Sequence, residues 1–153
     1  MAAVAGLTHA SKCLRPSFIP RPKRLKGARA YGVRYERSVA WATGGIHGQW
    51  FRYIDANGEA WCQTDVILKL GDRIAVIECK LSNIAEADEQ LTRLYVPVVA
   101  KALHMPVVGI IVVRHLKPST DLGRIVDSLG RALEVASPQA PWPVVHWMGR
   151  GPI

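Results

Sequence analysis

Two acidic residues and a lysine stand at a spacing that suits phosphate chemistry. Glu78 and Lys80 end an apolar, strand-like run, and side chains two residues apart in a strand share a face. Twelve residues separate Asp65 from Glu78. If Gly71 and Asp72 form the turn of a hairpin, Asp65 lies directly opposite Glu78, with Cβ atoms about 4.5–5.5 Å apart. Two carboxylates at that distance can hold one divalent cation and repel each other without one.

This set of donors predicts a divalent metal site. Oxygen ligands without His or Cys side chains favour Mg²⁺, with Mn²⁺ as a substitute, over Zn²⁺. The backbone carbonyl of Cys79 is a candidate further ligand. Lys80 would place positive charge near an attacking water and near the charge that develops on a phosphate. We therefore expect metal-dependent hydrolysis of phosphodiester bonds.

The pattern of apolar residues predicts an α/β fold that positions these groups. The expected elements are a helix over 27–43, strands over 47–55, 59–70 and 73–81, a helix over 84–104, a strand over 107–113 buried on both faces, a helix over 121–136 and a short strand over 143–148. Turns at Asn57-Gly58 and Gly71-Asp72 make the first three strands an antiparallel meander. Asn83 and Glu86 form a capping box, and Pro97 is expected to kink the second helix. The result is a mixed central sheet flanked by helices.

This order of elements, together with Asp65 and Glu78-Cys79-Lys80, resembles the PD-(D/E)XK nuclease superfamily over residues 27–113. Thr64 stands where that motif usually has a proline. The resemblance implies a restriction-endonuclease-like fold and a Mg²⁺-dependent deoxyribonuclease, with Asp65 and Glu78 as metal ligands and Lys80 as a catalytic residue. An endonuclease is preferred over an exonuclease.

The resemblance also points to Glu36 and Gln90. Glu36 matches a glutamate that serves the metal site in many members, and its apolar neighbours at helical spacing turn it inward, where a carboxylate needs a partner. The alternative is a salt bridge with Arg29 or Arg37. Gln90 and Tyr95 resemble a substrate-side pair on the second helix, although their spacing is one residue longer than usual. Gln90 in a structural hydrogen-bond network is the alternative.

The charge of the chain favours a polyanionic partner. Twenty Lys and Arg residues against twelve Asp and Glu give a formal charge of +8, which attracts nucleic acid through counterion release. Residues 1–26 are predicted to be a basic, proline-containing arm, which contacts phosphates or is a solubilising tail, and residues 27–153 the nuclease-like domain. Arg52 is expected opposite Gln63 on the Asp65 face. The candidate nucleic-acid contacts are Arg21, Lys23, Arg24, Lys26, Arg52 and Gln90.

Several classes are excluded by the same sequence. No apolar run is long enough to span a bilayer, and three cysteines without a Cys-x-x-Cys pair predict a reducing, cytoplasmic or other intracellular compartment. DNA is the expected substrate, and RNA is also compatible with the charge. A homodimer or a larger nucleic-acid-processing complex remains open. The rival functions are a non-cleaving nucleic-acid-binding subunit of the same fold and a basic protein adaptor with an accidental motif.

Overall fold

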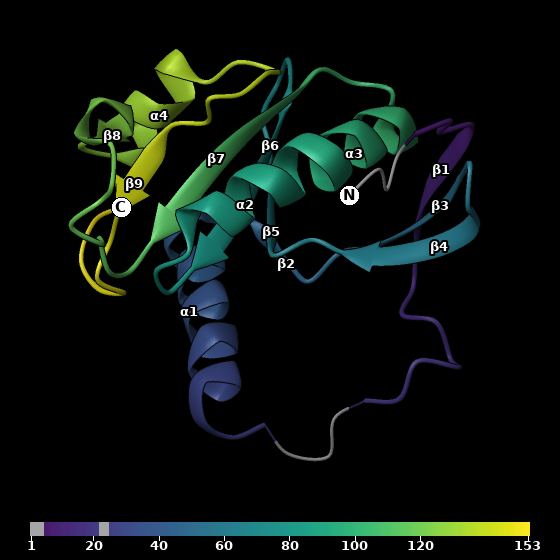
Figure 1. The fold of residues 1–153 in the computed structure, drawn as a ribbon, viewed down its shortest axis with the longest axis horizontal. Coiled ribbons are helices and arrows are strands. Elements are labelled where there is room, and N and C mark those ends of the chain that lie inside the picture. Colours follow the sequence, from purple (N-terminus) through teal and green to yellow (C-terminus); the bar gives the residue numbers. More distant parts are fainter. Residues whose placement is uncertain (1–4, 22–24) are drawn as a thin grey trace.

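The computed structural model describes residues 5–21 and 25–153, which form two sheets covered by helices (Figure 1). The strands are β1 (His9–Cys13), β2 (Ile46–His47), β3 (Trp50–Asp55), β4 (Gly58–Gln63), β5 (Val66–Lys69), β6 (Ile74–Lys80), β7 (Val107–Val113), β8 (Ile125–Val126) and β9 (Val144–His146). The helices are α1 (Gly27–Thr43), α2 (Ile84–Gln90), α3 (Val96–Leu103) and α4 (Leu129–Val135), with a π turn η1 (Leu91–Tyr95) and a 3₁₀ turn η2 (Leu122–Arg124). The predicted α/β class is confirmed.

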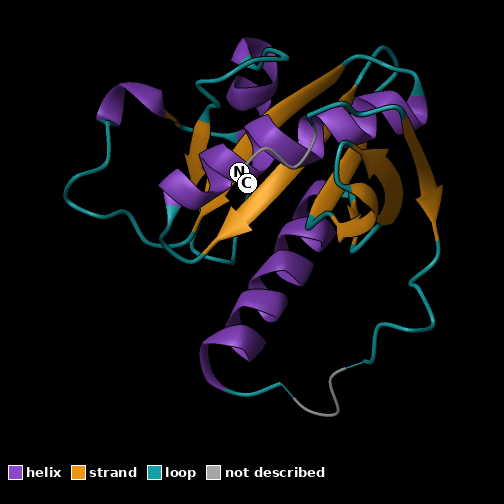
Figure 2. Ribbon diagram, turned by 45° about the vertical axis from the view of Figure 1, so that its right-hand side comes forward, coloured by secondary structure: helices purple, strands orange, loops and turns teal. Residues whose placement is uncertain are grey.

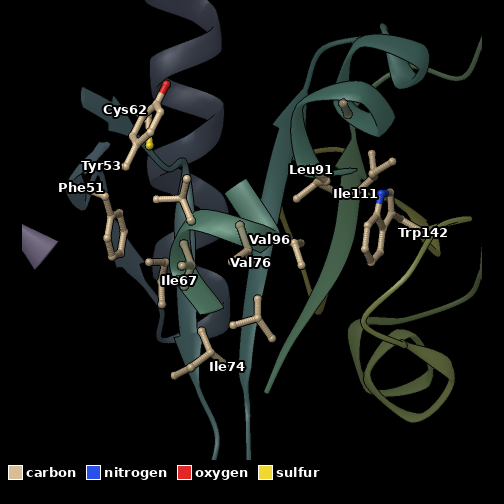
Figure 3. Close-up of a cluster of buried hydrophobic side chains, with 14 of the residues drawn as sticks. Phe51, Tyr53, Cys62, Ile67, Ile74, Val76, Leu91, Val96, Ile111 and Trp142 are labelled. Carbon is tan, nitrogen blue, oxygen red and sulfur yellow. The ribbon is translucent and has the colours of Figure 1, made fainter. Parts of the chain in front are cut away.

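A six-stranded mixed sheet, in the order β2-β5-β6-β7-β9-β8, forms the centre of the molecule. β6 and β7 are adjacent and parallel, and every residue of β7 is buried, as its uninterrupted apolar sequence predicts. Val76 and Ile111 pack on one face, against the helix formed by α2, η1 and α3 (Figure 3). Ile77 and Ile110 pack on the other face, against α1 and α4. The sheet is therefore covered by helices on both faces.

The predicted meander is divided between two sheets. The expected strand over 59–70 breaks at Thr64 and Asp65 into β4, which pairs with β3, and β5, which pairs with β6. The backbone N–H and the hydroxyl of Thr64 both donate to the carbonyl of Gln49, at 3.0 and 3.1 Å, and the N–H of Gly48 donates to the carbonyl of Asp65 at 3.0 Å. The single-strand prediction was wrong because an apolar pattern does not mark where a strand changes sheet.

The register of the β3–β4 hairpin also differs from the expected one. Gln63 lies opposite Trp50 rather than Arg52. The turn lies at residues 56–57, and Gly58 is already the first residue of β4, with a φ of 101°. The predicted pairing was wrong because the Asn-Gly signal places a turn only to within a residue.

Two helix boundaries lie where local signals predict. α1 covers the predicted range and ends at Gly44, which adopts a φ of 75° that suits glycine. Its N-terminal end extends away from the sheets (Figure 2). The second helix starts after Asn83, whose side chain accepts the N–H of Glu86 at 3.1 Å. Of the described helices, none is both long and apolar enough to cross a lipid bilayer.

The irregularity expected at Pro97 takes the form of the π turn η1. The N–H of Val96 bonds to the carbonyl of Leu91, five residues earlier. Proline has no N–H, and its ring displaces the carbonyl four residues before it. The helix therefore accommodates one more residue in this turn than an α-helix does.

Two further segments differ from the sequence prediction. The prediction of a helix over 121–136 was wrong for its first half. Ile125 and Val126 pair with β9 as strand β8, and α4 begins only after Ser128. In the predicted arm, β1 pairs with β3 along five residues, so this part of residues 1–26 belongs to the three-stranded sheet. The apolar residues of 122–133 fit one continuous helix and also fit a short strand followed by a helix. Only the packing against β9 decides between these two structures.

Candidate metal and phosphodiester site

The break between β4 and β5 opens one end of strand β6. β5 pairs with β6 only over Val66–Lys69, with Val66 opposite Ile77 as the predicted register requires. The last residues of β6 keep β7 as a neighbour on one side and have no β5 residue beside them on the other. The Asp65 carboxylate lies there instead, and its Oδ2 accepts the N–H of Cys79 at 2.8 Å.

Asp65 and Glu78 meet as predicted, and their carboxyl groups lie within hydrogen-bonding reach of each other. Glu78 is 3% exposed, and its Oε2 has no hydrogen-bond partner among the described residues. Burial first, and then the hydrogen bond and charge of Asp65, raise the pKa of Glu78 well above its ordinary value. Burial also raises the pKa of Asp65, opposed by the hydrogen bonds from Glu78 and Cys79. Without a cation, the raised pKa of Glu78 favours a proton on this carboxyl group.

The backbone of Cys79 faces the same place. The N–H and C=O of one strand residue point to the same neighbouring strand. Because the N–H of Cys79 points to Asp65, its carbonyl also lies on the Asp65 side of β6. The Cys79 side chain is on the opposite face, in the core with α1. The predicted backbone ligand is thus on the correct edge of the strand.

Glu36 reaches this centre from α1. Its Oε1 is 3.1 Å from Nε2 of His47, so its partner is a histidine on β2 rather than Arg29 or Arg37. After burial, the charge of Glu36 is among the causes that raise the pKa of Asp65 and of Glu78. The sequence gives no signal for His47, because its contact with Glu36 depends on how β2 packs beside α1.

Lys80 is held by the second helix. Its Nζ donates to Oε1 of Glu86 at 2.6 Å, and Nε2 of Gln90 donates to the same oxygen at 3.4 Å. Oε1 of Gln90 is buried without a partner among the described residues. Glu86 was predicted only as a helix cap, and it serves both as the cap and as the partner of Lys80.

Tyr95, on the same helix as Gln90, lies near the carboxyl groups of Asp65 and Glu78. Burial, followed by the charges of Glu78 and Asp65, raises the pKa of Tyr95. Tyr95 follows Gln90 by five residues, one more than a single α-helical turn brings onto one face. The π turn between them takes up the extra residue, so that Gln90 contacts Glu86 while Tyr95 lies close enough to Glu78 and Asp65 to be affected by their charges.

A cavity of about 980 Å³ lies over the site. Basic and aromatic residues surround its acidic centre. Its walls include Arg15, Arg29, Glu36, Arg37, His47, Trp50, Gln63, Asp65, Cys79, Lys80 and Glu86. The Arg15 guanidinium lies 5.4 Å from the centroid of the Trp50 ring. Arg15, Arg29 and Arg37 were not among the predicted contacts, since only the folded chain brings residues 15, 29 and 37 to one opening.

The other predicted nucleic-acid contacts lie elsewhere. Arg52 pairs with Glu59 and does not line the cavity. Arg21 and Lys26 are exposed, and Lys26 lines a separate hollow with the N-terminal part of α1. Lys23 and Arg24 lie outside the described residues.

The donor set fits a hard divalent cation that completes its shell with water and substrate. Within residues 5–21 and 25–153, no three His, Cys, Asp or Glu side chains are arranged as a ready metal cage. Two adjacent carboxyl groups, with the buried Oε2 of Glu78 unpartnered among the described residues, match a cation that takes one or two protein carboxylates. Glu78, Asp65 and the Cys79 carbonyl would hold it.

Comparisons with protein-family models, with curated proteins and with solved structures gave no match for this chain.

Proposed function

We propose that this protein is a divalent-metal-dependent nuclease that hydrolyses phosphodiester bonds in DNA. The proposal depends above all on one observation: the Asp65 and Glu78 side chains meet at a buried strand end, beside Lys80 and under a cavity with basic walls. A pair of buried like charges has no stabilising role of its own. A cation would make the pair favourable.

The order and pairing of the elements support the restriction-endonuclease-like fold that the sequence suggested. α1, the β5–β6 hairpin, the α2–η1–α3 helix and the parallel strand β7 follow in the order of that core. The additional sheet of β1, β3 and β4 lies beside it. The acidic residues occupy the strand end that this fold uses, and Glu36 reaches them from the first helix.

Each side chain has a distinct task in the proposed reaction. When bound, the divalent cation supplies Lewis-acid stabilisation of charge on a phosphate. Asp65 and Glu78 hold it, and Glu36 accepts a hydrogen bond or ion pair from His47 at the edge of the same centre. Lys80 carries positive charge into a side-chain environment that is 17% exposed, where it stabilises developing negative charge better than in bulk water. Glu86 orients its ammonium group.

The basic walls and the arm supply the affinity for phosphates. Arg15, Arg29 and Arg37 surround the acidic centre, and Arg21 and Lys26 extend the charge along the chain before α1. Because β1 is part of a sheet, charge substitution tests the arm more cleanly than truncation does. Replacing Arg21 and Lys26 by alanine should reduce the salt slope of log affinity by about 0.9 for each lost phosphate contact. An unchanged slope would leave the arm only a structural role.

The test is a cleavage assay with a thermal-stability readout. Purified protein is incubated with linear duplex, single-stranded, circular and four-way-junction DNA, in Mg²⁺, in Mn²⁺ and in EDTA. We expect cleavage only with metal. We also expect metal to raise Tm without DNA, because a ligand that binds only the folded state stabilises it by RT ln(1 + [L]/Kd).

Asp65→Ala should lose both the cleavage and the Tm response. Asp72→Ala is a matched control, since Asp72 lies at the other end of the same hairpin with an exposed carboxylate, and it should keep both. A wild-type protein that neither cuts any of these substrates nor responds to either metal would reject the proposal.

One contact favours a second candidate, a DNA-binding subunit of the same fold that does not cut. The Lys80 ammonium is already paired with Glu86, which leaves it less available to a phosphate. In that case DNA binds in EDTA and in Mg²⁺ with similar affinity and stays intact. Metal-dependent cleavage that is lost in Asp65→Ala would exclude this candidate.

A further inference from the structure

Trp41 on α1 is 90% exposed, although tryptophan is usually covered by other side chains. It forms one wall of a second cavity, of about 630 Å³, outside the site described above. The chain between residues 147 and 153 forms the opposite wall. Isolated exposed apolar residues need no explanation, but this one stands beside a hollow that also has apolar walls.

The charged side chains around this cavity are basic. Arg37 and Arg150 line it, and its described lining contains no acidic residue. In the described part of the chain, no ion pair or hydrogen bond of either guanidinium is present. Arg37 and Trp41 are four residues apart on one helix and therefore lie on one face. The hollow thus combines an exposed indole ring with two arginine side chains.

Arg37 also lines the cavity over Asp65 and Lys80. The two cavities therefore adjoin along the same side of α1. A chain of phosphates that passes the carboxylate centre meets Arg37 next and Trp41 one helical turn later. This continuity argues for an occupant that also reaches the candidate active site.

We propose that Trp41 is a stacking platform for an unpaired base of single-stranded DNA, with Arg37 and Arg150 on the flanking phosphates. An indole face stacks on bases only where they are not already stacked within a duplex. A second copy of this chain fits less well, because it would bring more positive charge, from a chain of formal charge +8, against two unpaired arginines. The proposal rests on the proposed function in one respect: the DNA strand is taken to run from the candidate active site toward Trp41. If both proposals hold, the substrate is DNA with an unpaired segment next to the cleaved bond.

The test measures binding in EDTA, where the proposed chemistry does not operate. The full chain is titrated with a fluorescent single-stranded oligonucleotide of mixed sequence and, separately, with its duplex. Trp41→Ala should weaken single-strand binding by about 5- to 150-fold, the range for loss of one stacked base, and should change duplex affinity less than about twofold. Trp41→Phe keeps an aromatic face and should retain most of the wild-type affinity for single strands.

Leu122→Ala is the matched control, because Leu122 is also an exposed apolar residue, at 76%, and lines neither cavity. It should bind single strands as the wild type does. Thermal melting of each variant establishes that it is folded, and the exposure of Trp41 makes a change in Tm unexpected.

Three results would overturn the proposal: no single-strand binding by the wild type, equal binding by Trp41→Ala, or a change from dimer to monomer in Trp41→Ala on sedimentation, which would make this face an interface between copies. These outcomes are separable from the fate of the nuclease proposal. Trp41-dependent binding without cleavage in Mg²⁺ or Mn²⁺ would reject only the nuclease, and cleavage with unchanged Trp41→Ala binding would reject only the platform.

Discussion

The two halves of β6 are continuous in the chain but differ in the strands that lie beside them. Ile74–Ile77 lie between β5 and β7 and are apolar and buried. Glu78–Lys80 keep only β7 beside them, and the place of the missing strand is taken by the Asp65 carboxylate. The first half is stabilised by packing on both faces. The second half carries charged groups that packing cannot satisfy.

This difference shows how the fold brings polar groups together at a strand end without a loop. A strand inside a sheet has its backbone groups paired and its side chains packed. When the neighbouring strand leaves for another sheet, the backbone of Cys79 becomes available to a side chain and to a ligand. The rigid half positions the open half, because both belong to one strand. Substitutions should therefore separate stability from chemistry at the boundary between Ile77 and Glu78.

The largest effect is expected for Glu78→Gln. A neutral amide mimics a protonated carboxyl, the form that the raised pKa of Glu78 favours without metal, so Tm without metal should stay equal or rise. Metal binding should be lost, and cleavage should fall by at least about 10³-fold, since a bound cation contributes several kcal/mol and each 1.36 kcal/mol is tenfold. Cleavage rates and Tm with and without Mg²⁺ measure both. A variant that is unfolded without metal would contradict the assignment of the proton to Glu78.

The next effect is expected at Lys80. Lys80→Ala should lower the cleavage rate by about 10²- to 10³-fold, because one preorganised electrostatic contact to the transition state is removed, while DNA affinity stays within a few-fold. Lys80→Arg keeps the charge in a wider, planar group and should be partly active at best. Glu86→Gln is the matched variant, since it leaves the lysine and removes only its partner, and it should change the rate by less than about tenfold. Single-turnover rates and separate affinities distinguish these cases, and wild-type cleavage by Lys80→Ala would exclude Lys80 from the chemistry.

A smaller effect is expected from pH. The pKa of Glu78 is raised in the folded protein, so the folded state binds its proton more tightly than the unfolded state does. The free energy of unfolding of the metal-free protein should therefore fall as the pH rises from the ordinary glutamate pKa through the raised one. Metal must displace the proton, so its apparent affinity should rise with pH by up to about tenfold per unit in the same range.

Calorimetric titrations of Mg²⁺ or Mn²⁺ at several pH values measure the affinity and, in buffers of different ionisation enthalpy, the proton released. Glu78→Gln supplies the control for stability, because it has no proton to lose at this position. If metal affinity in the wild type were independent of pH, Asp65 and Glu78 would already be charged without metal, and a proton on Glu78 would be excluded.

The elements with local signals could be predicted from the sequence. α1 ends at Gly44, the second helix begins at Asn83, and the apolar run of β7 needs both faces covered. The break at Asp65 and the short strand β8 could not be predicted, because each depends on a partner strand far away in the chain. The same holds for β1, whose five residues read as part of a basic arm until β3 lies beside them.

The residues of the candidate site also fall into those that local rules predict and those that depend on packing between distant elements. The meeting of Asp65 with Glu78 follows from a tight turn and a period of two, which are local rules, and the structure confirms it. His47 and the lysine-binding role of Glu86 follow from how separate elements pack. Trp41 lies on the side of α1 opposite the buried Tyr35, Val39 and Ala40, so its exposure follows from the helical period, whereas the hollow beside it depends on how the C-terminal segment packs.

The smallest effect is expected in the packed half of β6. Ile77 is fully buried and faces α1, so Ile77→Val removes one methylene from the core. The free energy of unfolding should fall by about 0.5–1.5 kcal/mol, while the metal-induced rise in Tm and the cleavage rate should stay as in the wild type. Denaturant unfolding with and without Mg²⁺ measures this beside Glu78→Gln, which should show the opposite pattern of preserved stability and lost metal response. If Ile77→Val also lost the metal response, the two halves of β6 would act as one unit, and the separation of scaffold from site at this boundary would be wrong.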